Sequence, residues 1–570
     1  KSSQAEATTG QFNTSVGTSS MGVGNTTGDN NVALGYLAGN KITSGQRNVL
    51  IGSNTGDEIT TGESNVAVGH GALSAEDANG STTAIGYKAL NIQNAGAESY
   101  NVAVGFEAGV KVQTGLFNTM VGAEALSTNI DGDANTAIGY QALKSFEADT
   151  DGHGSNTAVG AEAMRDATTG VNNTGIGQFA MGDGVLTGDE NVAVGMHSMR
   201  NVTSTQYSTA IGAKAMGSGV ATGDYNTAVG YNCGNSITSG AENILIGSFT
   251  GDALTSGLRN VAIGYAALTT GVSNGLNVAI GYEAMKVQNA GNTYNVAIGY
   301  NAALASTTAE KNTIVGAHAG DAVTTGGFNV AIGYDSLGSN TVGNSNIAIG
   351  SGAMATNVAA DRNVAIGTMA LENMTSATTA DHYNVAVGYH AGNSVTSGTA
   401  NTLMGGLTGD TLTTGIDNVA LGFNALTTED TGSRNVAVGR EALRDLDFNG
   451  SGYNIAVGHQ AGKSIVSGIQ NIAIGGLSMD ALTTGSSNVA IGYASMTSAN
   501  GSEGRNTAIG HQALFAMDAD GNNYNTAVGY NSGSSITTGV QNVIMGALAG
   551  DAITTGSNNI AIGYRALSTE

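Results

Sequence analysis

A short unit recurs along the chain, and this recurrence constrains the fold more than any other feature. Reading from Asn31, the chain gives NVALG, then NVLIG from Asn48 and NVAVG from Asn65, and further copies follow to the end. We take the last Gly of each unit as a marker and number the other positions from it. The marker occurs 32 times between Gly17 and Gly563, and 21 of the 31 intervals are 17 residues long. A fixed period with insertions confined to one stretch predicts a stacked solenoid rather than several globular domains.

The residues before the marker predict a short strand. Position −3 is Val, Thr or Ile in every copy, and position −1 is Val, Ile, Leu or Met. Residues two apart share one face of a strand, so we predict that positions −3 and −1 face the interior of the coil. Position −2, which is Ala in 24 of 32 copies, then faces outward. We interpret this Ala column as a surface that another apolar element, such as a second chain, approaches closely.

Three further columns support an all-β coil. The marker Gly fits a corner that needs positive φ or has no room for a Cβ. Position −4 is Asn in 30 of 32 copies, and stacked Asn amides can hydrogen-bond from turn to turn. Position +3 is always small, and the chain contains no Pro, which suits a continuous backbone ladder. The 88 Gly residues argue against helices.

We therefore predict an elongated parallel β-solenoid, or β-roll, of about 32 rungs over residues 13–570. Residues 1–12 form an N-terminal lead-in or cap in this interpretation. Because the chain begins with Lys1 rather than Met, we expect a processed product or a fragment.

A longer period is superimposed on the short one. Large residues interrupt the Ala column at intervals close to multiples of about 70 residues, which indicates blocks of four rungs. We interpret each interruption as a layer that fills a wider space. The interrupting residues are Leu50, Met120, Leu245, Ile314, Leu403 and Ile544.

The unit is similar to the N-S-V-A-I-G-x-x-[SA] rung of trimeric autotransporter adhesin heads. The version NTAIGYQAL from Asn135 also resembles repeats of phage tail-fibre proteins and of large bacterial surface proteins. The resemblance implies a YadA-like left-handed parallel β-roll and a homotrimer of parallel chains. It also implies an extracellular, cell-surface or virion location and a host-cell surface glycan or protein as receptor.

Charge and composition exclude several classes of protein. The 19 Lys and Arg face 43 Asp and Glu, and a net charge of −24 argues against a nucleic-acid partner. No run of 18 apolar residues exists, so we expect no membrane insertion of this segment. The eight His form no zinc-protease motif, and Ser, His and Asp follow no triad pattern. We therefore expect no catalytic residues and no enzyme activity.

Acidic loops are the best candidates for a ligand site. Alternating carboxylate and amide oxygens before a Gly are typical of calcium cages, but Asp, Asn and Gly also favour turns without any metal. We favour the turn interpretation, keep Ca²⁺ as the alternative, and expect no other cofactor. The candidate metal ligands are Asp77, Asn79, Asp149, Asp151, Asp445, Asp447, Asn449, Asp518 and Asp520.

Positions +1 and +3 of the repeat carry residues that we expect to have a packing role. Position +1 is commonly Tyr, as at Tyr36, Tyr87 and Tyr140, and we expect these rings to pack over neighbouring rungs or chains. Cys233 occupies the small +3 position, where we expect it to pack as a small hydrophobe.

The leading functional hypothesis is a non-catalytic structural shaft and adhesin. The alternative is a monomeric surface-binding or filament-forming solenoid, of the ice-binding or cell-surface-layer type. A glycan-degrading fibre is a third hypothesis, but the sequence has no pair of carboxylates patterned for it.

Overall fold

A computed structural model describes residues 9–23, 25–78, 80–147, 153–376 and 378–569 of the chain. The described residues form an all-β parallel β-solenoid of about 32 turns and contain no helix. The chain divides into two compact units, Lys1–Asn292 and Thr293–Glu570, which we call unit 1 and unit 2.

Unit 1 has sixteen strands of three residues each, one per turn. They are β1 Thr14–Val16, β2 Val32–Leu34, β3 Val49–Ile51, β4 Val66–Val68, β5 Thr83–Ile85, β6 Val102–Val104, β7 Thr119–Val121, β8 Thr136–Ile138, β9 Thr157–Val159, β10 Thr174–Ile176, β11 Val192–Val194, β12 Thr209–Ile211, β13 Thr227–Val229, β14 Ile244–Ile246, β15 Val261–Ile263 and β16 Val278–Ile280.

Unit 2 repeats this arrangement in sixteen turns. Its strands are β17 Val296–Ile298, β18 Thr313–Val315, β19 Val330–Ile332, β20 Ile347–Ile349, β22 Val364–Ile366, β24 Val385–Val387, β25 Thr402–Met404, β26 Val419–Leu421, β27 Val436–Val438, β28 Ile455–Val457, β29 Ile472–Ile474, β30 Val489–Ile491, β31 Thr507–Ile509, β32 Thr526–Val528, β33 Val543–Met545 and β34 Ile560–Ile562. Two short strands, β21 Ala360–Asp361 and β23 Ala380–Asp381, pair with each other in a separate two-stranded sheet.

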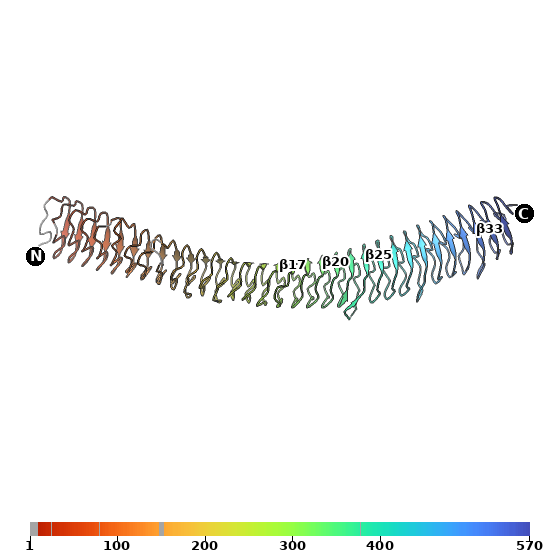
Figure 1. Ribbon diagram of the computed structural model, residues 1–570, viewed down its shortest axis with the longest axis horizontal. Coiled ribbons are helices and arrows are strands. Elements are labelled where there is room, and N and C mark those ends of the chain that lie inside the picture. The colour runs from red at the N-terminus through yellow and green to blue at the C-terminus, as the bar shows by residue number, and fades with distance from the viewer. Residues whose placement is uncertain (1–8, 24, 79, 148–152, 377, 570) are drawn as a thin grey trace. The chain divides into compact units, whose positions relative to one another are not determined.

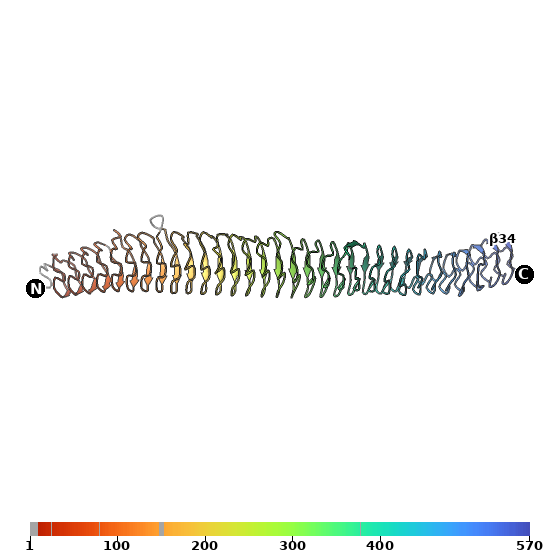
Figure 2. The ribbon, with the colours of Figure 1, turned by 90° about the horizontal axis from the view of Figure 1, so that it is seen from below.

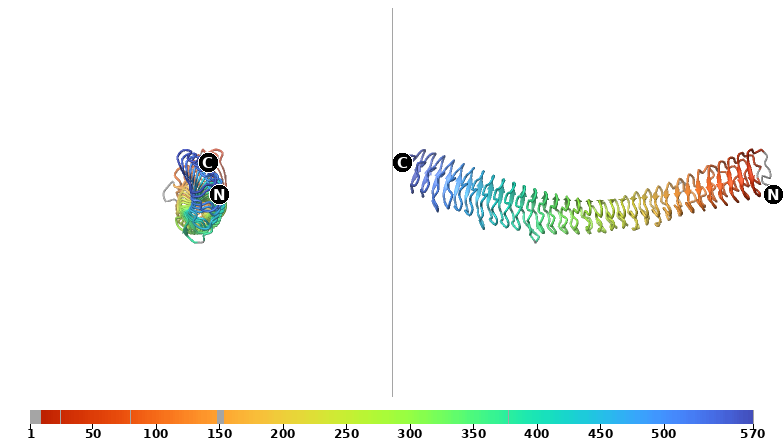
Figure 3. Two further views of the ribbon diagram at one scale, coloured as in Figure 1. Left: turned by 90° about the vertical axis from the view of Figure 1, so that its right-hand side faces the viewer. Right: turned by 180° about the vertical axis from the view of Figure 1, so that it is seen from behind.

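Consecutive turns pair in parallel with identical positions in register. In unit 1, for example, Val261 of β15 pairs with Val278 of β16 and Ala262 pairs with Ala279. Figure 1 shows β20, β25 and β33 among the side-by-side arrows of unit 2, and Figure 2 shows the corresponding arrows of unit 1 in red to green. The view from behind shows the loops of each unit stacked in the same order (Figure 3). The predicted turn-by-turn stacking of the repeat is therefore confirmed.

The orientation predicted for the strand faces is wrong. In β15 the side chain of Ala262 is fully buried, whereas those of Val261 and Ile263 are half-buried. The same pattern of a buried central residue between two more exposed ones recurs in β4, β22 and β29. The Ala column is the core, and the β-branched columns face outward. The reason is width, because a coil closed by about 17 residues has room for one small and one large side chain opposite each other but not for Val facing Leu.

The large residues of the Ala column fill the same narrow core from the opposite wall. Regular turns place Leu or Met at position +4, such as Leu268, which is fully buried. Where the strand carries Leu245, position +4 of the same turn is Gly251, and a Cβ there would lie 3.1 Å from Leu245 Cδ2. Likewise a Cβ on Gly320 would lie 2.9 Å from Ile314 Cδ1. Five of the six large residues have Gly at position +4 of the same turn, whereas Met120 is faced by Gly109 of the preceding turn, on which a Cβ would lie 2.5 Å from Met120 Sδ. The long period is thus an exchange of a large and a small residue across the core, and the predicted wider layer is wrong.

The columns predicted to form the corner and the amide ladder are confirmed. Gly52 has φ of +139°, and a Cβ on it would lie 2.5 Å from the carbonyl oxygen of Gly69, the next marker. The buried Asn48 amide donates to Asn31 Oδ1 (3.0 Å) and to Gly62 O (2.8 Å). The backbone N–H of Asn48 also donates to Asn31 Oδ1 (3.0 Å). Each Asn therefore satisfies backbone groups of the adjoining turns inside the coil.

Each turn also holds ordinary residues in the left-handed backbone region. Position +2 has φ of +57° at Leu37 and position +4 has φ of +53° at Leu73, while position −5 has φ of +59° at Arg47. Such residues usually cost about 1–3 kcal/mol each unless the surroundings fix them. Here the turns above and below fix them through backbone bonds, such as that from Leu37 N to Thr18 O (3.0 Å).

Candidate interaction surface

The −1 strand positions form a continuous apolar column along each unit, and the −3 positions beside them are Val, Ile or Thr. We call positions −3 and −1 together the outward face. Its residues are partly screened by the identical positions of adjoining turns, yet Ile211 and Ile244 remain 42% and 43% exposed. All sixteen −1 positions in each unit are Val, Ile, Leu or Met. Monomeric soluble proteins rarely expose a contiguous apolar patch larger than a few hundred Å². The outward face is therefore a candidate contact surface.

An aromatic column follows the strand at position +1. Tyr87 and Phe106 stack with their ring centroids 5.2 Å apart, and Tyr265 stacks on Tyr282 at the same distance. Tyr87 is 42% exposed. The rings thus cover neighbouring turns of their own chain, as expected, and still present an edge to solvent.

A second exposed column, at position −5, combines aromatic and cationic residues. Tyr207 stacks on Tyr225 (5.1 Å) in unit 1. In unit 2 the cation of one turn lies over the ring of the next: Arg434 over Tyr453 (5.8 Å) and, about four turns later, Arg505 over Tyr524 (5.5 Å). Sequence reasoning missed this column, although its 17- to 19-residue spacing was a usable signal.

The described acidic loops bond within their own turn or to neighbouring turns rather than to one another. Asp77 accepts from the hydroxyl of Thr60, and Asp445 holds Arg444 through two hydrogen bonds of 2.7 Å. Asp447 is exposed. Asn79, Asp149 and Asp151 lie outside the described residues.

The remaining candidates show the same behaviour. Asn449 Oδ1 accepts from the Thr431 hydroxyl, and Asp520 Oδ1 accepts from the backbone N–H (3.1 Å) and hydroxyl (3.2 Å) of Ser502. Asp518 is exposed. In the described part of the chain, no group of three or more His, Cys, Asp or Glu side chains is placed to hold a metal ion. These contacts favour the turn interpretation, and calcium binding stays a prediction that a calorimetric titration tests.

Buried glutamates, among them Glu76, Glu429 and Glu503, lie beside these loops, and the sequence did not reveal them. Glu429 is fully buried; its Oε1 accepts from Gly432 N (2.6 Å), while its Oε2 has no partner. Burial, reinforced by the charge of Asp447, raises the pKa of Glu429 to about 7. Glu503 is likewise buried beside Asp520, and burial raises its pKa.

His511 and Cys233 both pack within the columns of the repeat. His511 at position +1 stacks between Tyr493 (5.5 Å) and Tyr530 (5.2 Å). The Cys233 thiol is buried and donates to Leu245 O (3.2 Å), and burial raises its pKa to about 12. Ser198, in the same +3 position, donates equivalently to Ala210 O (2.9 Å). Cys233 therefore packs as a small core residue.

Neither a scan against protein-family models nor a search of curated protein sequences gave a match. Among the described residues, no helix is long and apolar enough to cross a bilayer.

Proposed function

We propose that the chain is a non-catalytic fibre segment, displayed outside a cell or on a virion, that serves as a shaft and as an adhesive surface. In this proposal the outward face packs against further copies of the chain, and a homotrimer is the assembly we favour. The observation that carries the proposal is the outward face itself, because a repeated apolar surface of this length needs a partner with the same repeat.

Energetic and geometric arguments support self-association. Burial of apolar surface contributes roughly 25 cal/mol per Å². A second copy carries the same residues at the same spacing, so each turn that docks adds the same increment. A closed symmetric assembly of identical chains buries such a face without leaving an open end for further growth sideways.

The exposed columns at positions +1 and −5 support the adhesive part of the proposal. Tyr and Arg are the side chains most enriched where proteins bind other molecules. Repetition along the coil multiplies weak contacts into avidity, and assembly of several chains multiplies them again. The receptor we expect is a glycan or protein of a host-cell surface.

A pair of charge variants tests this function. Ile211→Lys with Ile246→Lys places two cations on the outward face, and Ser239→Lys with Ser256→Lys places two on the exposed turn. We expect the first variant to keep its β circular dichroism, to fall to the chain mass of 56.5 kDa, and to lose attachment to host cells when displayed on beads. The turn variant keeps the mass and attachment of the unmodified protein. Equal behaviour of the two variants would contradict the proposal.

One observation favours a second candidate, the monomeric surface-binding solenoid. The outward −3 positions of β7 to β10 are Thr119, Thr136, Thr157 and Thr174, which pair in register. A flat ladder of Thr beside β-branched apolar residues suits an ordered surface such as ice. Thermal hysteresis or faceted ice growth at micromolar protein, together with a monomeric mass, would establish this candidate instead.

A further inference from the structure

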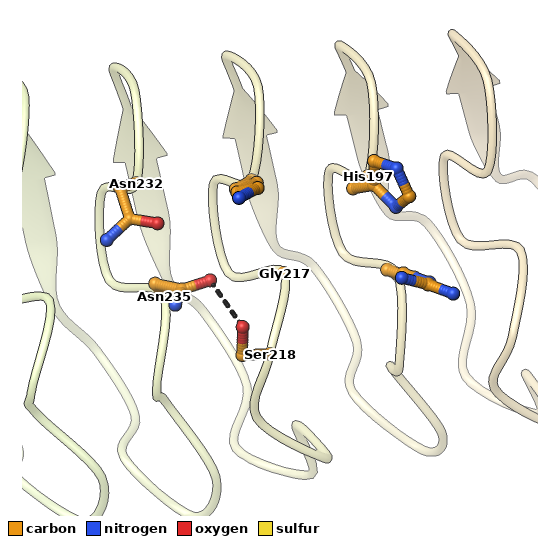
Figure 4. Close-up of a pocket in the computed structure, with 7 residues that line it drawn as sticks. His197, Gly217, Ser218, Asn232 and Asn235 are labelled. Atoms are coloured by element: carbon orange, nitrogen blue, oxygen red, sulfur yellow. Dashed lines mark hydrogen bonds between the residues drawn. The ribbon is translucent and has the colours of Figure 1, made fainter.

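A polar pocket of about 360 Å³ opens on the surface of unit 1, and no residue of the outward face lines it. It spans three successive turns, those of β11, β12 and β13. Figure 4 shows that His197 and Asn232 reach toward it from different turns. Its lining residues are His197, Arg200, Lys214, Gly217, Ser218, Asn232 and Asn235.

The repeat register builds this pocket. His197, Lys214 and Asn232 are the +2 residues of consecutive turns and have φ between +57° and +59°. Arg200, Gly217 and Asn235 are the corresponding +5 residues. Because Gly217 has no side chain, a gap remains between the side chains on either side of it in this column.

Residues outside the pocket hold the side chains of His197 and Arg200 in their orientation. The His197 ring stacks on Phe179 (5.4 Å, 13°), and Arg200 lies over the same ring (5.3 Å). Arg200 Nε forms an ion pair with Asp183, which also pairs with Arg165 (3.2 Å). Packing and ion pairs therefore hold His197 and Arg200 in place before any ligand arrives.

The chemistry of the lining suits an anion. No carboxylate lines the pocket, although the chain carries a net charge of −24. Every lining side chain can donate a hydrogen bond. His197 Nδ1 is buried and has no hydrogen-bond partner in the described part of the chain, so the ring keeps a nitrogen that is not committed to another residue. The Ser218 hydroxyl donates to Asn235 Oδ1 (2.9 Å), which fixes the orientation of that amide.

We propose that this pocket binds the carboxylate of an acidic sugar, with Arg200, Lys214 and His197 facing the carboxylate and Asn232 and Asn235 facing hydroxyl groups. The volume lies in the range of pockets that hold one small molecule. The assignment rests on the proposed adhesive function for its biological meaning, but its geometry lies within one chain and needs no assembly.

The protonation of His197 gives the proposal a second readout. Burial lowers the pKa of His197, and the neighbouring cations Arg200 and Lys214 lower it further, against the effect of Asp183. The ring is therefore neutral at pH 7.5 and gains a proton more readily once an anion is bound. Binding should strengthen by several-fold between pH 7.5 and pH 5.5.

Calorimetric titration of the full chain with methyl glycosides of N-acetylneuraminic acid and glucuronic acid tests the site. We expect a millimolar dissociation constant for at least one of them, weakened about tenfold by Lys214→Gln, as for loss of one charged hydrogen bond. Lys88→Gln is the matched control, because Lys88 occupies position +2 of another turn. It should leave binding unchanged.

Three results would overturn the proposal. The first is that neutral methyl glucoside binds as tightly as the acidic sugars. The second is that inorganic sulfate or a sulfated sugar binds at least as tightly as both carboxylated sugars. The third is that Lys214→Gln loses no affinity. Host-cell attachment that survives Lys214→Gln, with sugar binding lost, would leave the adhesive function standing and remove this pocket from it. The two failures are therefore distinguishable.

Discussion

The two faces of one strand carry different kinds of residue, and the contrast identifies which side of the coil is the interior. In β15, Ala262 is fully buried while Val261 and Ile263 keep part of their surface exposed. The more hydrophobic residues lie outside. Space rather than hydrophobicity therefore selects the inner residue, and the more hydrophobic residues lie on the outward face, which we propose is covered by further copies of the chain.

The interior of the coil has a fixed volume, whereas the residue types on the outward face vary from turn to turn. Inside, Ile314 is accommodated because position +4 of the same turn is Gly320. Outside, position −3 is Thr in eight turns of unit 1 and in four of unit 2, with no matching change elsewhere in the turn.

Changing Ile314 or Gly320, which face each other across the core, should have the largest effect on the free energy of unfolding. Ile314→Ala opens a cavity and should lower the free energy of unfolding by about 2–5 kcal/mol. Gly320→Leu alone overfills the same space and should destabilise the fold by about 1–3 kcal/mol. The double variant reproduces a regular turn, in which Leu337 occupies the +4 position with φ of +51°, the same as that of Gly320.

We therefore expect the double variant to be more stable than either single variant, measured by chemical denaturation as a double-mutant cycle. Additive losses would show that the two side chains do not share one space.

Glu429, whose side chain is buried inside the coil, should make the free energy of unfolding depend on pH. The pKa of Glu429 is about 7 in the folded chain and near 4.5 when unfolded, so the folded state binds the proton more tightly. The free energy of unfolding should fall as pH rises from about 4.5 to about 7, by about 3 kcal/mol, and stay level above that. Glu429→Gln should remove the part of this dependence that Glu429 contributes, leaving that of acids such as Glu503, and should be the more stable form at pH 8.

The exposed neighbour Asp430 supplies the control, because Asp430→Asn should leave the pH profile unchanged. Denaturant midpoints from pH 4 to pH 8 measure both variants. A wild-type profile that rises between pH 5 and pH 7 would contradict the assignment.

Breaking the inner amide ladder has a smaller effect. Asn260 Oδ1 accepts from Asn277 N (3.1 Å), and its amide donates to Asn274 O (2.8 Å). Asn260→Ala leaves buried groups unpaired and should cost about 1–3 kcal/mol. Asn260→Ser should cost less, since Ser208 fills this position in another turn and accepts from Asn226 N (3.1 Å). Equal costs for Ala and Ser would argue against the ladder.

Changes on the outward face should be the mildest for the fold. Val261→Thr introduces a residue that other turns already carry there, so the free energy of unfolding of a single chain should change by less than about 0.5 kcal/mol. Ala262→Val on the inner side of the same strand should destabilise it by about 1–3 kcal/mol. Thermal unfolding of the two variants compares the faces directly, and similar losses would contradict the contrast.

Much of the fold can be predicted from the repeat, because several of its positions each meet one requirement of the backbone. The marker Gly52 forms the corner and Asn48 forms the amide ladder, and both roles were predicted from the sequence. The alternation of Val, Ala and Val defines two faces, but it does not say which one is inside. That depends on the width of the closed coil, which in turn depends on left-handed residues such as Leu268, whose side chain gives no sign of its backbone conformation.

The candidate sites were harder to predict. The columns at positions +2 and +5 hold different residues in almost every turn, so the pocket at His197 and Lys214 comes from a particular overlap of three turns rather than from a motif. Glu429 looks like an ordinary turn residue until the position of its side chain inside the coil is known.

The absolute mass of the unmodified protein in solution, measured by light scattering after size exclusion, tests the central claim most directly. If the outward face is buried between copies of the chain, the mass should be near three times 56.5 kDa, about 170 kDa, and independent of dilution. A mass of 56.5 kDa at every concentration would show that the face stays uncovered by other copies and would contradict the account.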